Sequence, residues 1–251
     1  MNRVGLNTYC PSGFNFHRLA SSECPTAQTA VYRSRGEIIF VESLSRLGQH
    51  AVAFTVQRYG PLEIMVNNAV ISAMINLTSY QKGGFCRLHE IDGKVFDQDM
   101  AINARGVWLG VKYAAAQFLE QSPHPSGDRG WIVNICSVMG LVASHGTASY
   151  CASKGAVLKL TKATALDYAN DRIRVNCITP GYVDTVILEL IMAKSTGGQA
   201  EAQTARIRGL HPWGRMALPE DVARMAVFLT GSGASFCIGQ AFVVDGGYTT
   251  Q

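Results

Sequence analysis

Two side chains suited to acid–base chemistry lie at a fixed spacing in the middle of the chain. Tyr150 and Lys154 stand four residues apart, at the start of an Ala- and Leu-rich segment that continues to about Tyr168. If this segment is helical, the phenol and the ammonium share one face, one turn apart. The apolar, β-branched run that begins at Trp131 predicts a buried strand, and this strand would deliver the Ser137 hydroxyl towards the same place.

This trio fits proton transfer at a carbonyl or alcohol oxygen. A tyrosine with a pKa near ~10 is a poor base at neutral pH, but a nearby ammonium favours the phenolate. Ser137 would hydrogen-bond the substrate oxygen while Tyr150 donates or removes its proton. A Tyr–Lys pair at this spacing is also common on helix surfaces, so the surrounding residues have to decide between the two interpretations.

Further motifs accompany the trio in a consistent order along the chain. They are Val66-Asn67-Asn68-Ala69, Asn103 within Met100–Gly106, Pro180-Gly181-Tyr182-Val183-Asp184-Thr185, and Val244-Asp245-Gly246-Gly247. Together with the trio they resemble the short-chain dehydrogenase/reductase family over residues 60–251. The resemblance implies that Tyr150 is the acid/base and that Lys154 lowers its pKa and binds a ribose. It also implies that Ser137 orients the substrate and that Asn103 supports a proton-relay water.

The same resemblance implies NAD(P) as the cofactor, with no preference between NAD and NADP. Asn67, Asn68 and Ala69 follow a predicted strand, at the carboxyl end where open α/β sheets bind their ligands. Tyr150 and Lys154 would also contact the cofactor. The remaining expected cofactor contacts, against the nicotinamide and its carboxamide, are Pro180, Gly181, Val183 and Thr185.

The beginning of the chain departs from the family pattern. Arg3–Asn7 would be an opening strand, followed in the family by a turn of the form Thr-Gly-x-x-x-Gly-x-Gly whose backbone N–H groups cradle the pyrophosphate. Residues 8–15 read Thr-Tyr-Cys-Pro-Ser-Gly-Phe-Asn, so only Thr8 and Gly13 match. Tyr9 places a large side chain where a tight turn is required. Gly13 therefore stays the one candidate for the phosphate loop.

The stretch that follows is irregular. Residues 14–36 show neither a helical nor a strand period. The family fold needs about 60 or more residues between its first strand and Leu62, and residues 9–61 are too few for that. We therefore expect a truncated or irregular N-terminal part. Arg33 and Arg35 are candidates for a 2′-phosphate contact, or else solvated loop arginines, so the choice between NAD and NADP is unassigned.

The rest of the chain alternates between strand and helix patterns. The expected strands are 38–41, 62–68, 131–137, 173–179 and 241–245, and the expected helices are 43–59, 91–120 in two pieces, 150–168 and 219–229. This alternation predicts an α/β fold, a Rossmann-like doubly wound parallel sheet, in a single domain over residues 1–251. Residues 1–36 would be its degenerate cofactor-binding start, and residues 186–213 would be a substrate lid.

Composition and charge exclude several classes of protein. The net charge of +4 is mild and its Lys and Arg residues are scattered, so we expect no nucleic-acid partner. No apolar run is long enough to cross a membrane, and the N-terminus lacks a signal peptide. The 7 cysteines form no Cys-x-x-Cys pair, which favours reduced thiols and a cytoplasmic location. The 6 histidines fall at no metal-ligand spacing, so no metal is expected.

Two functions fit these observations. The first is an NAD(P)-dependent oxidoreductase that moves a hydride between nicotinamide and a secondary alcohol or ketone. The apolar lid residues of 186–192 favour a small apolar substrate, and the resembled family favours a homo-oligomer. The alternative is a non-catalytic scaffold of the same fold that has lost dinucleotide binding, because the loop at residues 8–15 is degenerate. An error in the gene model over residues 9–36 would also explain that stretch.

Overall fold

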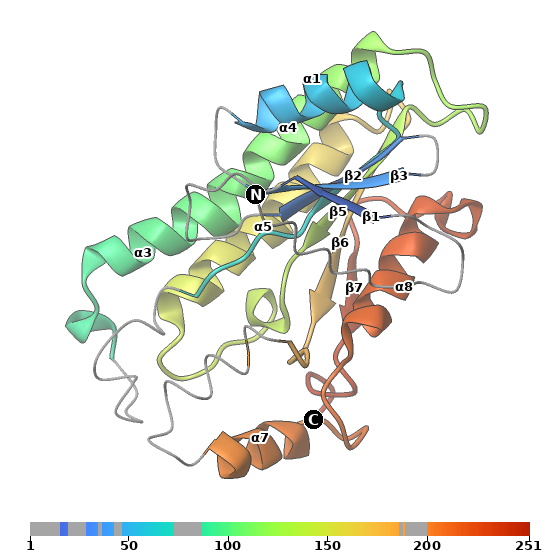
Figure 1. The fold of residues 1–251 in the computed structure, drawn as a ribbon. Coiled ribbons are helices and arrows are strands. Elements are labelled where there is room, and N and C mark those ends of the chain that lie inside the picture. The colour runs from blue at the N-terminus through green and yellow to red at the C-terminus, as the bar shows by residue number, and fades with distance from the viewer. Residues whose placement is uncertain are drawn as a thin grey trace, which may run out of the picture.

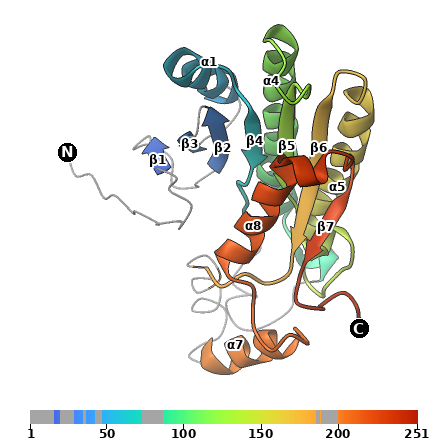
Figure 2. The same cartoon turned by 90° about the vertical axis from the view of Figure 1, so that its right-hand side faces the viewer.

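A seven-stranded sheet forms the centre of the molecule. In a computed structural model of the chain, the structure describes residues 16–19, 29–34, 37–42, 47–72, 87–185, 188 and 200–251. The strand order across the sheet is β1-β3-β2-β4-β5-β6-β7, which Figure 2 shows from one edge to the other. The strands are β1 Phe16–Leu19, β2 Thr29–Ser34, β3 Glu37–Glu42, β4 Ile64–Asn67, β5 Gly130–Ile135, β6 Ile173–Pro180 and β7 Ala241–Val244.

The second half of the sheet is parallel, as the sequence predicts. Strands β4, β5, β6 and β7 pair in parallel, with Asn67 opposite Asn134 and Asn134 opposite Cys177. All eight residues of β6 are buried, and most of β5 is buried too. Such continuous burial is typical of parallel strands covered on both faces. The carboxyl ends of β4, β5 and β6 therefore lie at one edge of the sheet.

The first half of the sheet corrects the sequence analysis. β1 and β2 both lie within residues 14–36, where no period was found. β1 pairs parallel with β3, but β2 runs antiparallel to both β3 and β4, so the sheet is mixed rather than wholly parallel. Neither β1 nor β2 shows a sustained alternation of apolar and polar residues, and strand pairing depends on the neighbours more than on intrinsic preference. The expected opening strand, 3–7, lies outside the described residues.

Helices cover both faces of the sheet. α1 Leu47–Tyr59, α4 Gly106–Glu120 and α5 Ala148–Asp167 lie on one face, and α8 Pro219–Thr230 lies on the other (Figure 1). The first group packs its apolar side chains on a core that includes Val111, Phe118 and Ile132. α8 packs on a second core around Val133, Ile178 and Leu229. This two-sided covering confirms the doubly wound class.

The expected helix 91–120 is a continuous run of three pieces. These are α3 Gly93–Asp99, a π-helical segment η3 Met100–Arg105, and α4, after a short 3₁₀ turn, η2 Leu88–Glu90. Asp92 caps α3 by accepting a hydrogen bond from the Lys94 backbone at 2.9 Å. π-helical turns occur frequently at functional sites, and this one contains Asn103.

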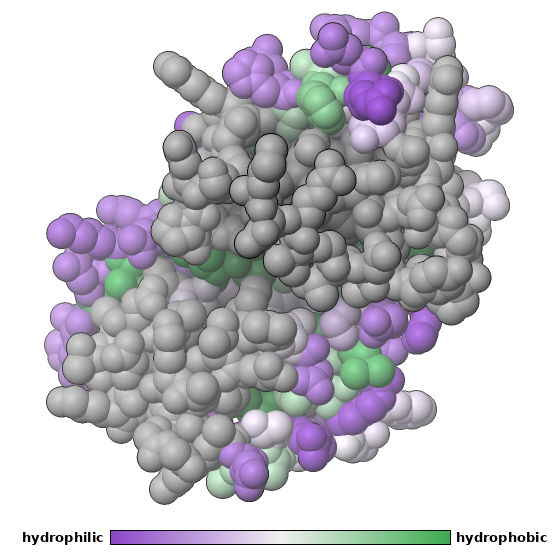
Figure 3. Space-filling model, in the orientation of Figure 1, coloured by the Kyte–Doolittle hydropathy of each residue, from purple (hydrophilic) through white to green (hydrophobic). Residues whose placement is uncertain are grey.

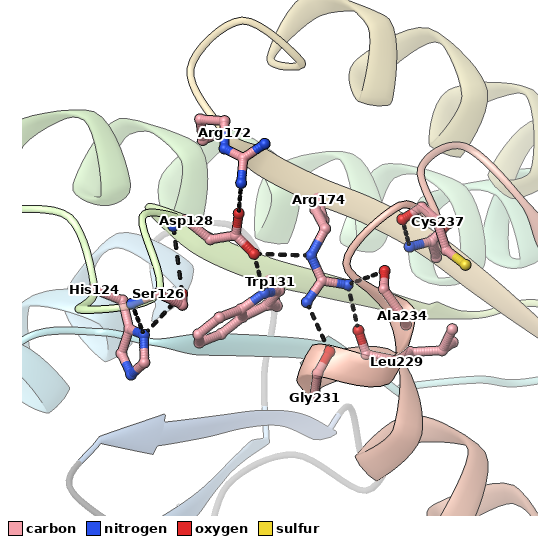
Figure 4. A network of polar contacts seen from close by, with 11 residues as sticks. His124, Ser126, Asp128, Trp131, Arg172, Arg174, Leu229, Gly231, Ala234 and Cys237 are labelled. Atoms are coloured by element: carbon pink, nitrogen blue, oxygen red, sulfur yellow. Dashed lines mark hydrogen bonds and ion pairs between the residues drawn. The ribbon is translucent and has the colours of Figure 1, made fainter.

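A buried arginine, Arg174, joins the amino end of β6 to α8. Nε of Arg174 donates to Asp128 at 3.0 Å, and its terminal nitrogens donate to the carbonyls of Leu229, Gly231 and Ala234 (Figure 4). Trp131 also donates to Asp128, at 3.0 Å. The guanidinium thus satisfies the Leu229 and Gly231 carbonyls at the end of α8, which a helix cannot pair internally, and the Ala234 carbonyl in the 3₁₀ turn that follows.

The expected substrate lid is described only in part. α7 Ala200–Gly209 lies within residues 186–213, at the end of the molecule towards which β6 points (Figures 1 and 2). Residues 186–187 and 189–199 lie outside the described part. The visible surface has hydrophilic areas along its upper and lower margins, with small hydrophobic areas among them (Figure 3). None of the described helices is long and apolar enough to span a membrane.

Candidate active site

Tyr150 and Lys154 occupy the first two turns of α5, as the spacing predicts. Lys154 is fully buried, and its Nζ lies 5.8 Å from the centroid of the Tyr150 ring. The same Nζ donates a hydrogen bond to the carbonyl of Ile135 at 2.9 Å. Ile135 is the last residue of β5, so the ammonium lies at the carboxyl end of that strand.

Ser137 reaches the same place from the strand. Its backbone is extended, with φ −169° and ψ 157°, and it caps the 3₁₀ turn η4 Val138–Gly140. Its Oγ accepts a hydrogen bond from the Met139 backbone at 3.2 Å. Ser137 also makes a side-chain hydrogen bond with Tyr150. The three residues selected from the sequence therefore meet, two from a helix and one from the end of a strand.

The protonation states differ from the expectation. Burial raises the pKa of the Tyr150 phenol well above its ordinary value, and the hydrogen bond with Ser137 opposes this only in part. Burial also lowers the pKa of Lys154 to about 8, against the pull of Cys136 and Asp99. The expected lowering of the tyrosine pKa by the ammonium is therefore wrong for this arrangement. Desolvation disfavours both charged forms and is the larger effect, so the Tyr150 phenol is held in its neutral form.

Asn103 is fully buried, and its side chain is fully engaged. Oδ1 accepts from the Ile71 backbone at 2.9 Å, and Nδ2 donates to the Ile71 carbonyl at 2.8 Å and to Ser153 Oγ at 3.0 Å. Ser153 Oγ donates in turn to the Tyr150 carbonyl at 2.8 Å. Asn103 thus ties the segment after β4 to the turn that carries Tyr150. Ser153 was missed in the sequence, although its position three residues after Tyr150 on the helix is a usable signal.

The residues at the end of β4 divide into two groups. Asn67 is buried, and its Nδ2 donates to Asn134 Oδ1 at 2.8 Å, while Asn134 Nδ2 donates to Thr161 at 2.9 Å. The Asn67 side chain therefore points into the protein, and the chain of hydrogen bonds from Asn67 through Asn134 to Thr161 links β4, β5 and α5. Asn68 is exposed and Ala69 is half-buried at the strand end. Those two residues remain available to a ligand at the sheet edge.

The end of β6 supplies the other expected cofactor residues. Pro180 is its last, buried residue, and Gly181 donates its N–H to the Val244 carbonyl at 3.1 Å. Val183 pairs with Ala217 in an isolated bridge, and Thr185 Oγ1 accepts from the Leu188 backbone at 3.4 Å. The Pro180–Thr185 segment is therefore ordered at the same sheet edge as Ser137. Gly13 lies outside the described residues.

These residues have the donor set that a nicotinamide dinucleotide requires. An ammonium has three donors, and the described residues give Lys154 Nζ one acceptor, Ile135. Thr179, the residue before Pro180 in β6, has a buried Oγ1 with no hydrogen-bond partner in the described part of the chain. Spare donors of this kind suit ribose hydroxyls and a carboxamide, so Tyr150, Lys154 and the Pro180–Thr185 segment fit the cofactor.

A cavity and a thiol lie beside this group. The cavity has a volume of about 390 Å³, and its lining residues are Arg87, Leu88, Ala143, Ser144, His145, Gly146, Ala148 and Cys151. It adjoins the start of α5 without being lined by Tyr150 or Ser137.

Cys136 is buried and its Sγ donates to the Lys154 carbonyl at 3.2 Å. The hydrogen bond with Cys177 lowers the pKa of Cys136 to about 7, although burial acts to raise it.

Comparison with known proteins adds independent findings. A family model described as enoyl-(acyl carrier protein) reductase matches residues 45–249. The chain is 37% identical over 200 residues to 2-(S)-hydroxypropyl-CoM dehydrogenase 3 of Xanthobacter autotrophicus, covering 79% of this chain and 71% of the relative. It is 33% identical over 201 residues to cyclohexanol dehydrogenase of Acinetobacter sp., covering 80% and 69%.

Two further matches bear on activity and on the fold. The inactive 2-(S)-hydroxypropyl-CoM dehydrogenase 2 of Xanthobacter autotrophicus is 37% identical over 200 residues, covering 79% of this chain and 78% of the relative. Among solved structures, the aldohexose dehydrogenase of Thermoplasma acidophilum superposes with a TM-score of 0.72 at 24% identity, covering 87% of this chain and 80% of that one. The second match bears on the fold alone.

Proposed function

This chain belongs to the short-chain dehydrogenase/reductase family of oxidoreductases, and from this premise we propose that it transfers a hydride between NAD(P) and a secondary alcohol or ketone. The observation that carries the proposal is the meeting of Ser137, Tyr150 and a buried Lys154 at the carboxyl end of β5. A bound nicotinamide supplies or accepts the hydride, a reaction that side chains alone do not perform.

The side chains perform the proton chemistry. Tyr150, whose pKa is raised, is neutral at physiological pH and donates its proton to the carbonyl oxygen during reduction. Ser137 donates a hydrogen bond to the same oxygen, while its Oγ accepts from the Met139 backbone. Lys154, charged below about pH 8, stabilises negative charge that develops on the phenol oxygen. In the direction of oxidation, the same groups act in reverse, and Tyr150 has to lose its proton first.

The side chain of Asn103 is not available for the expected contact with a proton-relay water. Both N–H groups of its side chain are used by Ile71 and Ser153. We therefore assign the side chain to holding the Tyr150 turn. A relay through this residue would have to use its backbone.

The proposed substrate is a small alcohol or ketone with an apolar body. The relatives are named for hydroxypropyl-CoM and cyclohexanol, both of which carry a secondary alcohol. The cavity beside α5 is of a size for a small molecule, and Leu88, Ala143 and Ala148 give it apolar walls. We also propose that the enzyme is cytoplasmic and homo-oligomeric. Its chain would form one domain, with residues 186–213 as the substrate lid.

One experiment decides whether the chain works as an oxidoreductase at all. The purified protein is titrated with NADH and with NADPH while the nicotinamide fluorescence is recorded, and a panel of cyclic and linear secondary alcohols is then offered with the oxidised cofactor that binds. The proposal expects saturable binding in the micromolar range and turnover of at least one alcohol. The comparison between NADH and NADPH also assigns the cofactor preference.

A scaffold without cofactor is the second candidate. Two observations favour it: the family model matches from residue 45 onward, and a relative of equal identity is named inactive. The degenerate segment at residues 8–15 lies before that match. If neither dinucleotide binds while the protein is folded by circular dichroism, the scaffold replaces the enzyme.

A further inference from the structure

His211 lies at a junction of three parts of the molecule. It is 2% exposed and follows α7, the described helix of the lid segment. One neighbour is the Gly181–Tyr182 turn at the end of β6, and another is the C-terminal turn around Tyr248. The ring centroids of His211 and Tyr248 are 5.6 Å apart, and those of His211 and Tyr182 are 5.9 Å apart.

The two ring nitrogens of His211 have fixed roles. Nδ1 lies 2.9 Å from the Ile207 carbonyl, which can only accept, so Nδ1 carries the proton. Nε2 lies 3.2 Å from the Tyr182 backbone nitrogen, which can only donate, so Nε2 is the acceptor. These contacts define a neutral imidazole with one tautomer. His211 thereby satisfies a partly buried backbone donor in the turn after Pro180.

The glycine before Tyr182 makes this contact possible. A Cβ on Gly181 would lie 2.9 Å from His211 Nε2 and 3.1 Å from the Asp245 backbone. Gly181 thus leaves room for the imidazole to approach the turn. The segment is held on its other side as well, because Tyr182 accepts from the Ala217 backbone at 2.9 Å and Asp184 donates to the Ala217 carbonyl at 2.8 Å.

The C-terminal turn fixes the other side of His211. Gly246 and Gly247 have positive φ values of 57° and 87°, and the Trp213 backbone donates to the Gly246 carbonyl at 3.0 Å. Asp245 accepts from Thr249 and Gly247, and these bonds hold its pKa below the ordinary value although burial acts to raise it. Gln251 donates to the Leu210 carbonyl at 2.9 Å, and both views place the C-terminus beside α7 (Figures 1 and 2).

We propose that His211 is a positioning residue for the nicotinamide half of the cofactor. It holds the turn Gly181–Thr185 in place from the lid side, and it couples that turn to α7 and to the C-terminal residues. This inference rests on the proposed function, because it assigns the Pro180–Thr185 segment to the nicotinamide. Losing the imidazole acceptor leaves the Tyr182 N–H unsatisfied and lets the turn shift.

Matched variants and two ligands test the proposal. His211→Phe keeps an aromatic ring without either nitrogen, and His211→Gln keeps a donor and an acceptor. His124→Phe is the control, since His124 lies beyond α4 and bonds Ser126 in an exposed turn. NAD(P)H binding is measured by nicotinamide fluorescence, ADP-ribose binding by calorimetry, and the melting temperature by circular dichroism.

The expected result is specific to the nicotinamide. His211→Phe should weaken NAD(P)H binding about tenfold while ADP-ribose affinity stays within about twofold. His211→Gln should restore most of the affinity, and His124→Phe should leave both ligands unaffected. Equal loss for both ligands, or no loss for either, overturns the positioning role while the oxidoreductase stands. If the unaltered protein binds neither NADH nor NADPH, the proposed function fails and this inference fails with it.

Discussion

At the scale of single residues, burial decides the chemistry of the site. The Tyr–Lys spacing is readable in the sequence, but the pKa values depend on how much water the fold removes. Burial raises the pKa of Tyr150 and lowers that of Lys154 to about 8. The proposed reduction would therefore take its proton from a neutral phenol, beside a lysine that loses its charge near physiological pH.

This arrangement predicts a pH dependence for ketone reduction. Lys154 is charged below its pKa and neutral above it, so kcat for reduction should fall as the pH rises through about 8. Tyr150 stays protonated over the same range because its pKa is raised. The measurement is kcat at saturating substrate from about pH 6 to about pH 9. Cys136→Ala should keep the fall but move it to lower pH, because Cys136 raises the pKa of Lys154. A flat profile, or a fall lost in this variant, would assign the titration elsewhere.

Asn103 offers a prediction on stability. Asn103→Ala leaves the backbone N–H and carbonyl of Ile71 without their side-chain partner and removes one of the two hydrogen bonds of the Ser153 hydroxyl, so the free energy of unfolding should drop by ~1–3 kcal/mol. Asn68→Ala, at an exposed position, should change it by less than ~0.5 kcal/mol. Urea unfolding followed by circular dichroism measures both. Equal stability of the two variants would remove the structural role given to Asn103.

At the scale of elements, helix ends and strand ends are joined by buried polar groups. The π-helical turn η3 places Asn103 against the segment after β4, and Arg174 on β6 binds the carbonyls at the end of α8. The sequence predicts the helices 91–120 and 219–229 from their patterns. Neither the π turn nor the partners of Arg174 could be predicted, because both depend on residues distant in the chain.

The two arginines on Asp128 provide a matched pair. Arg174 has a side chain 5% exposed, and its loss leaves a buried carboxylate without its main partner, so Arg174→Met should cost ~3–5 kcal/mol of unfolding free energy. Arg172 binds the same carboxylate with a side chain 61% exposed, and Arg172→Met should cost at most ~1 kcal/mol. Chemical denaturation compares them. Similar losses for both variants would show that burial of the guanidinium is not decisive.

At the scale of the whole molecule, the sequence predicts the second half of the fold better than the first. Strands 62–68, 131–137, 173–179 and 241–245 appear as β4 to β7, because each lies in a short apolar or β-branched run that is readable in the sequence. β1 and β2 went unrecognised, since their pairing is set by neighbouring strands and β2 runs antiparallel. In the site, Ser137, Tyr150 and Lys154 were found by spacing. Ser153 and His211 were not, because only the folded chain brings them to their partners.

The central claim is that Tyr150 transfers the proton during turnover, and its most direct test is single-turnover hydride transfer in Tyr150→Phe. The account predicts that this variant still binds NAD(P)H, weakened by no more than the loss of one hydrogen bond, but transfers hydride at least ~100-fold more slowly, because the acid is gone. Tyr168→Phe, at the other end of α5, should keep its rate. A folded Tyr150→Phe variant with undiminished hydride transfer would contradict the account.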